Sequence, residues 1–294
     1  MKSIELGLEW FLNPDHLPFI AGIEKGWFRD AGLDLTLIEP TEHYDGLANV
    51  ASGKLAFACN EPLHMIDETR PGLRALGCFF ETEGGVMLTP EGEQALGRGE
   101  TIRVASPVAG EVTDDLARLI VGRWCEREGI RFEPAQLQIE EAGFEHLQNL
   151  QAGFQGAWLC FANFEGVEAR ELGVQARLID STEVGLPNFS ALELFTGAGF
   201  QREYPEVVEA VTRITSEGAT LCREDPEQAI ALWYRYTGEA PSSLVDAIIR
   251  DTCHRLVSPV VPDVERWREM WRQFHSMGLS AVDEAGYEAL FEPA

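Results

Sequence analysis

Aromatic, amide and imidazole side chains gather in two short stretches of the chain, residues 9–16 and 57–64. The side chains that we select from them are Trp10, Asn13, His16, Asn60 and His64. An aromatic ring can stack on a flat ligand, and amide and imidazole groups can form hydrogen bonds with its edge. These residue types therefore favour a site for a small heteroaromatic molecule. The structural alternatives are a core role for Trp10, a helix-capping role for His16 and an ordinary surface position for His64.

A second group of candidates lies in residues 156–166, where Trp158, Asn163 and Glu165 surround the end of an apolar run. A carboxylate there can accept hydrogen bonds from an exocyclic amine or a protonated ring nitrogen. The alternative is that Glu165 satisfies backbone N–H groups at a helix start. Ser106 and Asn188 complete the candidate set. Ser106 precedes a predicted helix, where anions often bind, but residues 106–111 contain no Lys or Arg and include Glu111, so a phosphate is not expected there.

Known catalytic and metal-binding motifs are missing from the sequence. The six histidines show no HxH or HExxH spacing, so we predict no metal. There is no GxSxG, Walker or GxGxxG motif, and Ser, His and Asp residues are too scattered to indicate a triad. We therefore assign no catalytic residue and expect no cofactor.

The elements that must position the first group follow in regular order. Strands are predicted at residues 3–9, 33–37 and 55–59. Between them, one helix is expected to start at Pro18 and to end at Gly32, and another to span residues 44–52. This strand–helix–strand–helix–strand order indicates a parallel sheet with right-handed crossovers. Ligands bind beyond the carboxyl ends of such strands, which is where both candidate stretches begin or end.

The rest of the chain predicts a second lobe and a return to the first. Residues 65–69 are expected to be helical, and residues 90–100 are polar and lack a core pattern, which indicates a hairpin or a lobe boundary. Strands at 102–105, 137–139 and 157–161 alternate with helices, and residues from 203 onward are mostly helical. We therefore predict an α/β fold of two lobes, each a mostly parallel sheet flanked by helices. Lobe one comprises residues 1–90 and 186–294, lobe two comprises residues 91–185, and the two close on a solute.

Composition limits the partners and the compartment. The 294 residues carry 49 acidic and 23 basic side chains, a net charge of −26, which disfavours nucleic acid and anionic membranes. No window is apolar enough for membrane insertion. Residues 1–8 alternate like a strand rather than forming a signal peptide, and the six cysteines show no CxxC pairing. The chain as written is therefore expected in the cytoplasm, or in the periplasm if an export signal was trimmed.

The opening stretch resembles the thiamine pyrimidine-precursor family. The motifs that carry the resemblance are EWFLNPDH at 9–16, EKGWF at 24–28, GLDL at 32–35, LIEPT at 37–41 and SGKLAF at 52–57. The resemblance is strong over about residues 4–66 and weaker through 157–174 and 186–196. It implies the type II periplasmic-binding-protein fold. The family includes solute-binding proteins of ABC importers and a cytosolic, single-turnover hydroxymethylpyrimidine phosphate synthase.

Departures from the synthase branch favour a binding protein. The resemblance places His64 where the synthase consumes its own histidine, but Asn60 where it holds pyridoxal phosphate through a lysine. The cysteine-rich run of the synthase corresponds to LPNFSA at 186–191, and FANFEG at 161–166 is similar to the importer branch. We expect capture of a pyrimidine or similar heteroaromatic for ABC-type uptake, with a permease as a partner. The alternatives are a divergent synthase-like enzyme and a cytosolic ligand sensor.

Overall fold

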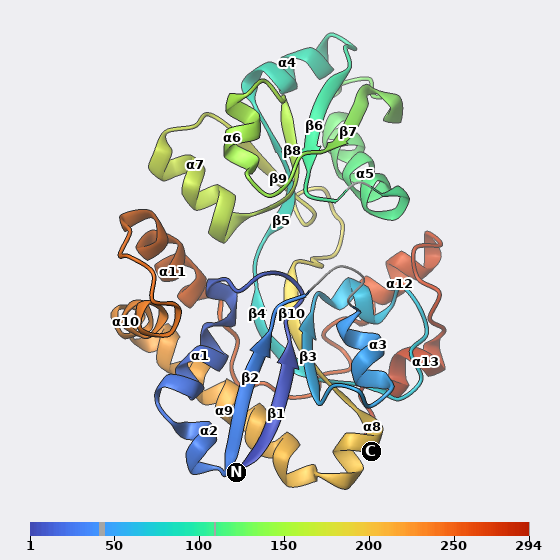
Figure 1. Ribbon diagram of the computed structural model, residues 1–294. Helices are drawn as coiled ribbons and strands as arrows, with labels where there is room; N and C mark the ends of the chain where they lie inside the picture. The colour runs from blue at the N-terminus through green and yellow to red at the C-terminus, as the bar shows by residue number, and fades with distance from the viewer. Residues whose placement is uncertain (41–44, 109, 294) are drawn as a thin grey trace. The chain divides into compact units, whose positions relative to one another are not determined.

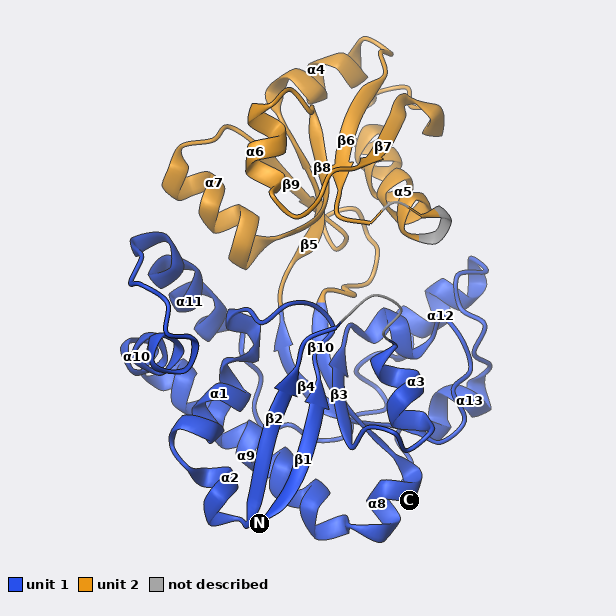
Figure 2. Cartoon of the chain, in the orientation of Figure 1, with its two compact units in different colours: residues 1–81, 191–294 blue, residues 82–190 orange. Residues whose placement is uncertain are grey.

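The computed structural model describes residues 1–40, 45–108 and 110–293 (Figure 1). The chain forms two compact units, which are described separately (Figure 2). Unit 1 comprises Met1–Glu81 and Ala191–Ala294, and unit 2 comprises Thr82–Ser190. The chain thus passes between the units twice, after residues 81 and 190, whereas the sequence analysis places these divisions after residues 90 and 185. The first division lies earlier because the strand after residue 83 pairs only within unit 2.

Unit 1 is built on a five-stranded sheet of order β2-β1-β3-β10-β4. Its strands are β1 (Lys2–Gly7), β2 (Leu33–Ile38), β3 (Phe57–Asn60), β4 (Leu73–Glu81) and β10 (Ala191–Gly197). Strand β1 pairs in parallel with β2 and β3, and β10 is antiparallel to β3 and β4. The parallel strands therefore end at one edge, where residues 8–16 and 60–64 leave the sheet.

Helices cover both faces of this sheet (Figure 1). They are α1 (Leu17–Glu24), α2 (Trp27–Asp30), α3 (Gly46–Ala51), α8 (Ala198–Glu203), α9 (Pro205–Glu224), α10 (Pro226–Thr237), α11 (Ser243–Arg255), α12 (Arg268–Ser276) and α13 (Glu284–Ala289), with 3-10 turns η1 (Pro14–His16) and η2 (Pro62–Met65). Helices α1 and α9 can approach closely because Gly218 has no side chain. A Cβ at this position would lie 2.2 Å from the carbonyl oxygen of Pro18. This contact anchors α1, and hence the segment that follows β1.

Unit 2 repeats the design with a sheet of order β7-β6-β8-β5-β9. Its strands are β5 (Gly84–Leu88), β6 (Ile102–Ser106), β7 (Leu137–Glu141), β8 (Gly156–Phe161) and β9 (Arg177–Asp180). Its helices are α4 (Pro90–Gly97), α5 (Glu111–Arg127), α6 (His146–Gln151) and α7 (Val167–Leu172), with η3 (Pro134–Gln136) and a π-helical turn, η4 (Ala162–Gly166). In each sheet one strand, β10 or β5, is antiparallel to its two neighbours. The predicted α/β class with mostly parallel sheets is confirmed.

Several predicted elements are wrong in detail. Residues 90–97 form α4 rather than a hairpin, because the Thr89 side chain caps its first turn and Leu96 is buried. The helix expected at 65–69 is the 3-10 turn η2, which starts at Pro62. The helix expected from Pro18 to Gly32 is divided at Gly26, whose φ of 77° ends α1 before α2 begins. Tyr44, the expected start of a helix, lies outside the described residues, and α3 begins at Gly46.

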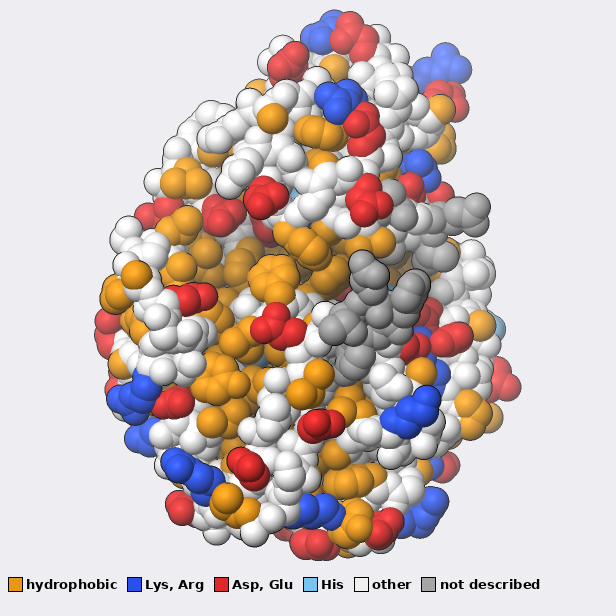
Figure 3. Space-filling model, viewed as in Figure 1, with side chains coloured by type: hydrophobic (Ala, Val, Ile, Leu, Met, Phe, Trp, Pro, Cys, Tyr) orange, Lys and Arg blue, Asp and Glu red, His pale blue; other side chains and the backbone are white. Residues whose placement is uncertain are grey.

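The surface and the helices bear on possible partners. Among the described residues, no helix is both long enough and apolar enough to cross a membrane. The face drawn in Figure 3 mixes apolar and acidic side chains with scattered basic ones, in keeping with the net charge of −26. The field of such a surface attracts cations and repels anions.

Candidate functional site

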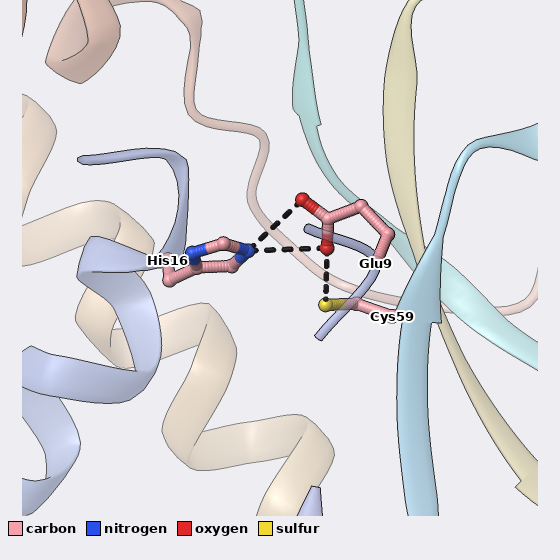
Figure 4. Close-up of side chains that lie close together, drawn as sticks. All are labelled: Glu9, His16 and Cys59. Atoms are coloured by element: carbon pink, nitrogen blue, oxygen red, sulfur yellow. Dashed lines mark hydrogen bonds and ion pairs between the residues drawn. The ribbon is translucent and has the colours of Figure 1, made fainter. Parts of the chain in front are cut away.

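Three buried side chains interlock at the carboxyl ends of β1 and β3 (Figure 4). Nε2 of His16 lies 3.0 Å and 3.1 Å from the two carboxylate oxygens of Glu9, and the Cys59 thiol donates to Glu9 Oε2 at 3.0 Å. Glu9 follows β1, His16 ends η1 and Cys59 lies in β3. The cluster therefore ties the segment after β1 to both the start of α1 and the neighbouring strand.

The hydrogen bonds of His16 define its protonation. The backbone N–H of Asn13 donates to Nδ1 at 3.1 Å, so Nδ1 carries no proton and Nε2–H donates to Glu9. The Asn13 side chain accepts from the backbone N–H of Asp15 and donates to the carbonyl oxygen of Phe11. Asn13 and His16 thus form a capping box around η1. Both residues are buried, and these contacts assign them to holding the loop that carries Trp10.

The negative charge of the cluster is carried by the Glu9 carboxylate. Burial acts to raise the pKa of Glu9, but the nearby His16 and the hydrogen bonds from His16 and Cys59 outweigh it, so this pKa is lowered. Burial and the adjacent Glu9 raise the pKa of the Cys59 thiol well above its usual range. A metal-bound histidine normally donates its second N–H to an acceptor, whereas Nδ1 of His16 faces a donor. The cluster is therefore built as a hydrogen-bonded support, and its histidine is not arranged as a metal ligand.

Trp10 and Glu61 meet beside this support. The Trp10 side chain forms a hydrogen bond with the Glu61 carboxylate, and Nε2 of His64 lies 3.6 Å from Glu61 Oε2. Glu61 is 13% exposed and His64 is 41% exposed, so both can be reached by a ligand. Burial raises the pKa of Glu61, with a further contribution from Glu9, against the opposing influence of His64 and Trp10. The three side chains form an aromatic, carboxylate and imidazole surface at the strand ends.

Arg70, which contacts residues 64–68, is paired with carboxylates. Arg70 lies 2.7 Å from Asp67, 2.8 Å from Glu68 and 3.5 Å from Asp45, and it also donates to the carbonyl oxygen of His64. Nδ1 of His64 lies 3.2 Å from Asp67. Among the described side chains around the end of β3, acidic groups thus outnumber basic groups.

Asn60 is held by its own backbone. Its Oδ1 accepts the N–H of Glu61 at 2.8 Å. The chain has only three lysines, Lys2, Lys25 and Lys54. Lys2 begins β1, Lys54 precedes β3, and Lys25 follows α1, so each belongs to the opposite edge of the sheet from Glu61. The strand ends of unit 1 consequently offer no amine that could form a Schiff base with an aldehyde cofactor.

In unit 2, Trp158, Asn163 and Glu165 lie on β8 and the π-turn after it. Glu165 Oε2 accepts the backbone N–H of Phe161 at 2.7 Å, and its Oε1 is 4.0 Å from Nε2 of His146. That separation is too long for a hydrogen bond. Burial lowers the pKa of His146 to about 4, so His146 is neutral at physiological pH. Trp158 and Asn163 are fully buried, and the Trp158 ring meets Phe189 edge-on.

Ser106 and Asn188 serve local backbone structure within unit 2. The Ser106 hydroxyl donates to the carbonyl oxygen of Val108 at 2.6 Å. The Asn188 amide donates to the carbonyl oxygen of Thr82, and its Oδ1 accepts from the backbone N–H of Ser190. Asn188 therefore joins the two segments at which the chain enters and leaves unit 2. Ala109, in the loop after Ser106, lies outside the described residues.

The structure brings together residues that the sequence analysis did not select. Glu9, Cys59 and Glu61 adjoin selected residues in both stretches, and His146 begins α6. The sequence feature that could have identified Glu9, Cys59 and Glu61 is their position at predicted strand ends. Residues next to a ligand-facing side chain at such an end share its surroundings. Nothing in the local sequence relates His146 to Glu165, because they are 19 positions apart and meet only through the fold.

Comparisons with known proteins agree with the fold and the resemblance. A family model described as "NMT1/THI5 like" matches residues 13–82 and 108–229. The formylaminopyrimidine-binding protein of Halalkalibacterium halodurans is 22% identical over 290 residues, covering 94% of this chain and 86% of the relative. The 4-amino-5-hydroxymethyl-2-methylpyrimidine phosphate synthase of Legionella pneumophila is 23% identical over 295 residues, covering 97% and 89%. The resemblance stated from the sequence is confirmed, but the relatives fall on both of its branches.

Solved structures of similar fold include solute-binding proteins. The periplasmic aliphatic sulphonate binding protein SsuA of Escherichia coli matches with a TM-score of 0.68 and 12% identity, covering 99% of this chain and 97% of SsuA. The ligand-binding component of an ABC-type import system from Staphylococcus aureus has a TM-score of 0.66 and 12% identity, with both chains fully covered. At these identities the likeness concerns the fold, which is the predicted periplasmic-binding-protein fold.

Proposed function

The chain belongs to the NMT1/THI5-like family, and on this premise we propose that it binds a pyrimidine or a similar small heteroaromatic ligand. Trp10 stacks on the ring, while Glu61, His64 and Glu165 supply polar contacts. Asn13 and His16 hold the Trp10 loop in place. Units 1 and 2, residues 1–81 with 191–294 and residues 82–190, act as the two lobes that close on the ligand. Closure strengthens each polar contact by excluding water.

The observation that carries the proposal is the chemistry of the strand ends in unit 1. They present an indole, a carboxylate and an imidazole, and the residue at the synthase lysine position is Asn60, whose side chain is bound to the next peptide. The lysines of the chain belong to the other edge of the sheet. This surface supports reversible binding and provides no amine for a covalent link to pyridoxal phosphate.

The biological role that fits this chemistry is capture for ABC-type uptake. The formylaminopyrimidine-binding relative and the import-system neighbours support it. In that role the protein acts in the periplasm or at the outer cell surface and delivers its ligand to a permease. Capture by a cytosolic sensor would use the same site without a permease.

A second candidate function is a divergent synthase activity, favoured by the Legionella pneumophila relative and by the exposed His64. Purified protein mixed with pyridoxal phosphate discriminates the two. We expect no absorbance band of a lysine Schiff base, because no lysine adjoins the site. Appearance of that band would replace the binding function with the enzymatic one.

The binding function is tested by isothermal titration calorimetry with 4-amino-5-hydroxymethyl-2-methylpyrimidine and its formylamino analogue. We expect saturable binding by the wild type and a loss of about tenfold or more in affinity in Trp10→Leu, since base–aromatic stacking contributes about 1–3 kcal/mol. The matched variant Trp10→Phe keeps a ring and should retain most of the affinity. Absence of binding to every pyrimidine tested would refute the proposal.

A further inference from the structure

The turn before α12 is attached to both strands through which the chain passes between the units. Arg266 donates from Nη2 to the Glu81 carboxylate, and Trp267 donates from Nε1 to Glu193 Oε2 at 2.9 Å. Glu81 is the last residue of β4 and pairs with Ala191, the first residue of β10. Both passages leave unit 1 at this pair. The turn therefore holds the strand ends that adjoin the two passages.

The guanidinium of Arg266 has a donor that its ion pair with Glu81 does not use. Nε of Arg266 is buried and has no hydrogen-bond partner among the described residues. Arg266 is 27% exposed and Glu81 is 34% exposed, so water screens their ion pair. Glu193 is only 1% exposed, and Arg266 interacts electrostatically with it as well as with Glu81. One cation thus serves a carboxyl group near solvent and another in the core.

The other titratable groups around Glu193 and Arg266 come from β4, the turn and α13. They are Cys78, Glu81, Asp263 and Tyr287. Burial raises the pKa of Cys78 and of Tyr287, so both groups stay neutral at ordinary pH. Asp263 accepts hydrogen bonds from two backbone N–H groups of its own turn, and its charge adds to the burial that raises the pKa of Glu193 to about 8. Glu81 and Glu193 are therefore the carboxyl groups that compete for Arg266.

From this arrangement we propose a proton-controlled exchange of partners, in which Arg266 binds Glu81 while Glu193 carries a proton and turns to Glu193 when that proton is lost. An unpaired carboxylate costs more free energy in the core than near solvent, so Arg266 follows the buried charge. The unused Nε–H supplies a donor for the new ion pair. Glu81 then loses its ion pair with the turn, and the end of β4 is released from it.

The exchange acts on the two passages between the units. With Arg266 on Glu81, the end of β4 and the start of β10 are held against the turn. With Arg266 on Glu193, this paired end opens more readily. In a protein that closes on a ligand, the protonation of Glu193 therefore sets the stiffness of the hinge, which is greater at neutral than at alkaline pH. This use of the hinge rests on the proposed function, whereas the exchange itself is tested without a ligand.

The test uses the full chain at about pH 6.5 and about pH 9, on either side of the Glu193 titration. The Nε1–H resonance of Trp267, assigned by its loss in Trp267→Phe, reports the protonation of Glu193. Amide hydrogen exchange in residues 80–82 and 190–192, corrected for the intrinsic effect of pH, reports the release of the strand ends. The amides of residues 4–6, in β1, are the reference for global unfolding.

Two variants separate the steps of the exchange. Glu193→Gln imitates the protonated carboxyl group, and Glu81→Gln removes the charge that holds Arg266 at the strand end. Glu81 is partly exposed, so Glu81→Gln should fold even if the buried substitution does not, and circular dichroism verifies both.

We expect the Trp267 resonance to follow the Glu193 pKa of about 8. The strand-end amides of the wild type should exchange about tenfold faster at the higher pH relative to the β1 amides. Glu193→Gln should remove both changes, and Glu81→Gln should exchange fast at both pH values. Equal acceleration of strand-end and β1 amides, a Trp267 resonance that does not titrate, or slow exchange in Glu81→Gln would overturn the proposal. Each of these outcomes leaves the proposed ligand binding intact.

Discussion

Each unit contains a glutamate–histidine pair with a buried histidine beyond the end of a strand, β1 in unit 1 and β8 in unit 2, and these two pairs differ in separation. In unit 1, Nε2 of His16 lies 3.0 Å from Glu9. In unit 2, Nε2 of His146 lies 4.0 Å from Glu165. Both histidines are buried. The first pair forms hydrogen bonds and the second does not, because the attraction of a hydrogen bond is lost within about an ångström of stretching.

The difference in separation indicates different roles for the two pairs: the Glu9–His16 pair supports a loop, and the Glu165–His146 pair is a candidate for ligand contact. Glu9 is engaged by His16 and by Cys59, and the ring of His16 is engaged at both nitrogens, so this pair fixes the loop of Trp10. Glu165 accepts the peptide N–H of Phe161, and no hydrogen bond joins it to His146. A pair joined by hydrogen bonds resists exchange with a ligand, and the Glu165–His146 pair lacks that restraint. We therefore propose that function concentrates at Glu61 and Glu165 and not at Glu9.

The largest expected effect comes from removing His16, and removal of His146 serves as the comparison. His16→Ala should lower the free energy of unfolding by about 3 kcal/mol, because it leaves a buried carboxylate without its main donor. His146→Ala removes a neutral ring that forms no hydrogen bond with Glu165, and we expect a loss of about 1–2 kcal/mol from packing alone. Urea unfolding monitored by circular dichroism gives the energies, and native-state hydrogen exchange assigns each loss to its unit. Equal losses would remove the distinction between the two pairs.

A third buried carboxyl group, that of Glu193, extends the comparison with Glu9, because it accepts a hydrogen bond from one side chain and not from two. Glu193, in β10, is 1% exposed and accepts from Trp267 Nε1 at 2.9 Å. Burial raises its pKa to about 8, against the opposing effects of Trp267 and Arg266. The folded state therefore binds this proton more tightly than the unfolded state. The stability that the bound proton contributes is fully present below the usual carboxyl pKa and is lost as the pH rises towards 8.

Replacement of Glu193 by Gln should remove that pH dependence. Between pH 5 and 7 the wild type should lose about 2–3 kcal/mol through this group, and Glu193→Gln should lose correspondingly less. The measurement is the difference in unfolding free energy between variant and wild type at the two pH values. Glu9→Gln is the control, because the lowered pKa of Glu9 contributes stability that is fully present above the usual carboxyl pKa and is lost only on acidification below it, so its difference from the wild type should not change between pH 5 and 7. A pH-independent difference for Glu193→Gln would contradict the assignment.

Much of the fold followed from local pattern in the sequence. Alternation in residues 33–37 and apolar spacing in residues 112–124 predicted β2 and the core-facing stripe of α5, because both elements bury one face. The prediction was wrong where tertiary contacts decide. Helix α4 buries only a few apolar side chains, among them Ala95 and Leu96, which is too weak a pattern to read from composition.

The candidate site was less accessible to prediction. The two strand ends in unit 1 were recognisable because Trp10 and His64 are conspicuous side chains at the ends of predicted strands. The roles of the neighbouring residues could not be predicted. A hydrogen bond between His16 and Glu9 depends on the distance between their side-chain atoms to within about an ångström, and the spacing of residues in the sequence does not give that distance. The pairing of His146 with Glu165 also required the three-dimensional arrangement of α6 and β8.

The smallest expected effect on stability comes from Glu165→Gln, which we compare with Glu9→Gln. Glu165→Gln keeps an oxygen for the N–H of Phe161, so its stability should change by less than about 1 kcal/mol, while affinity for the 4-amino pyrimidine should fall about tenfold through loss of a charge-assisted hydrogen bond. Glu9→Gln should show the reverse order, because its amide would place a donor opposite His16 or Cys59, which already donate. Calorimetric affinity and urea unfolding are measured on both variants. If Glu9→Gln weakened binding more than Glu165→Gln while the two variants were equally stable, Glu9 would be the residue that contacts the ligand. The roles proposed for the two pairs would then have to be exchanged.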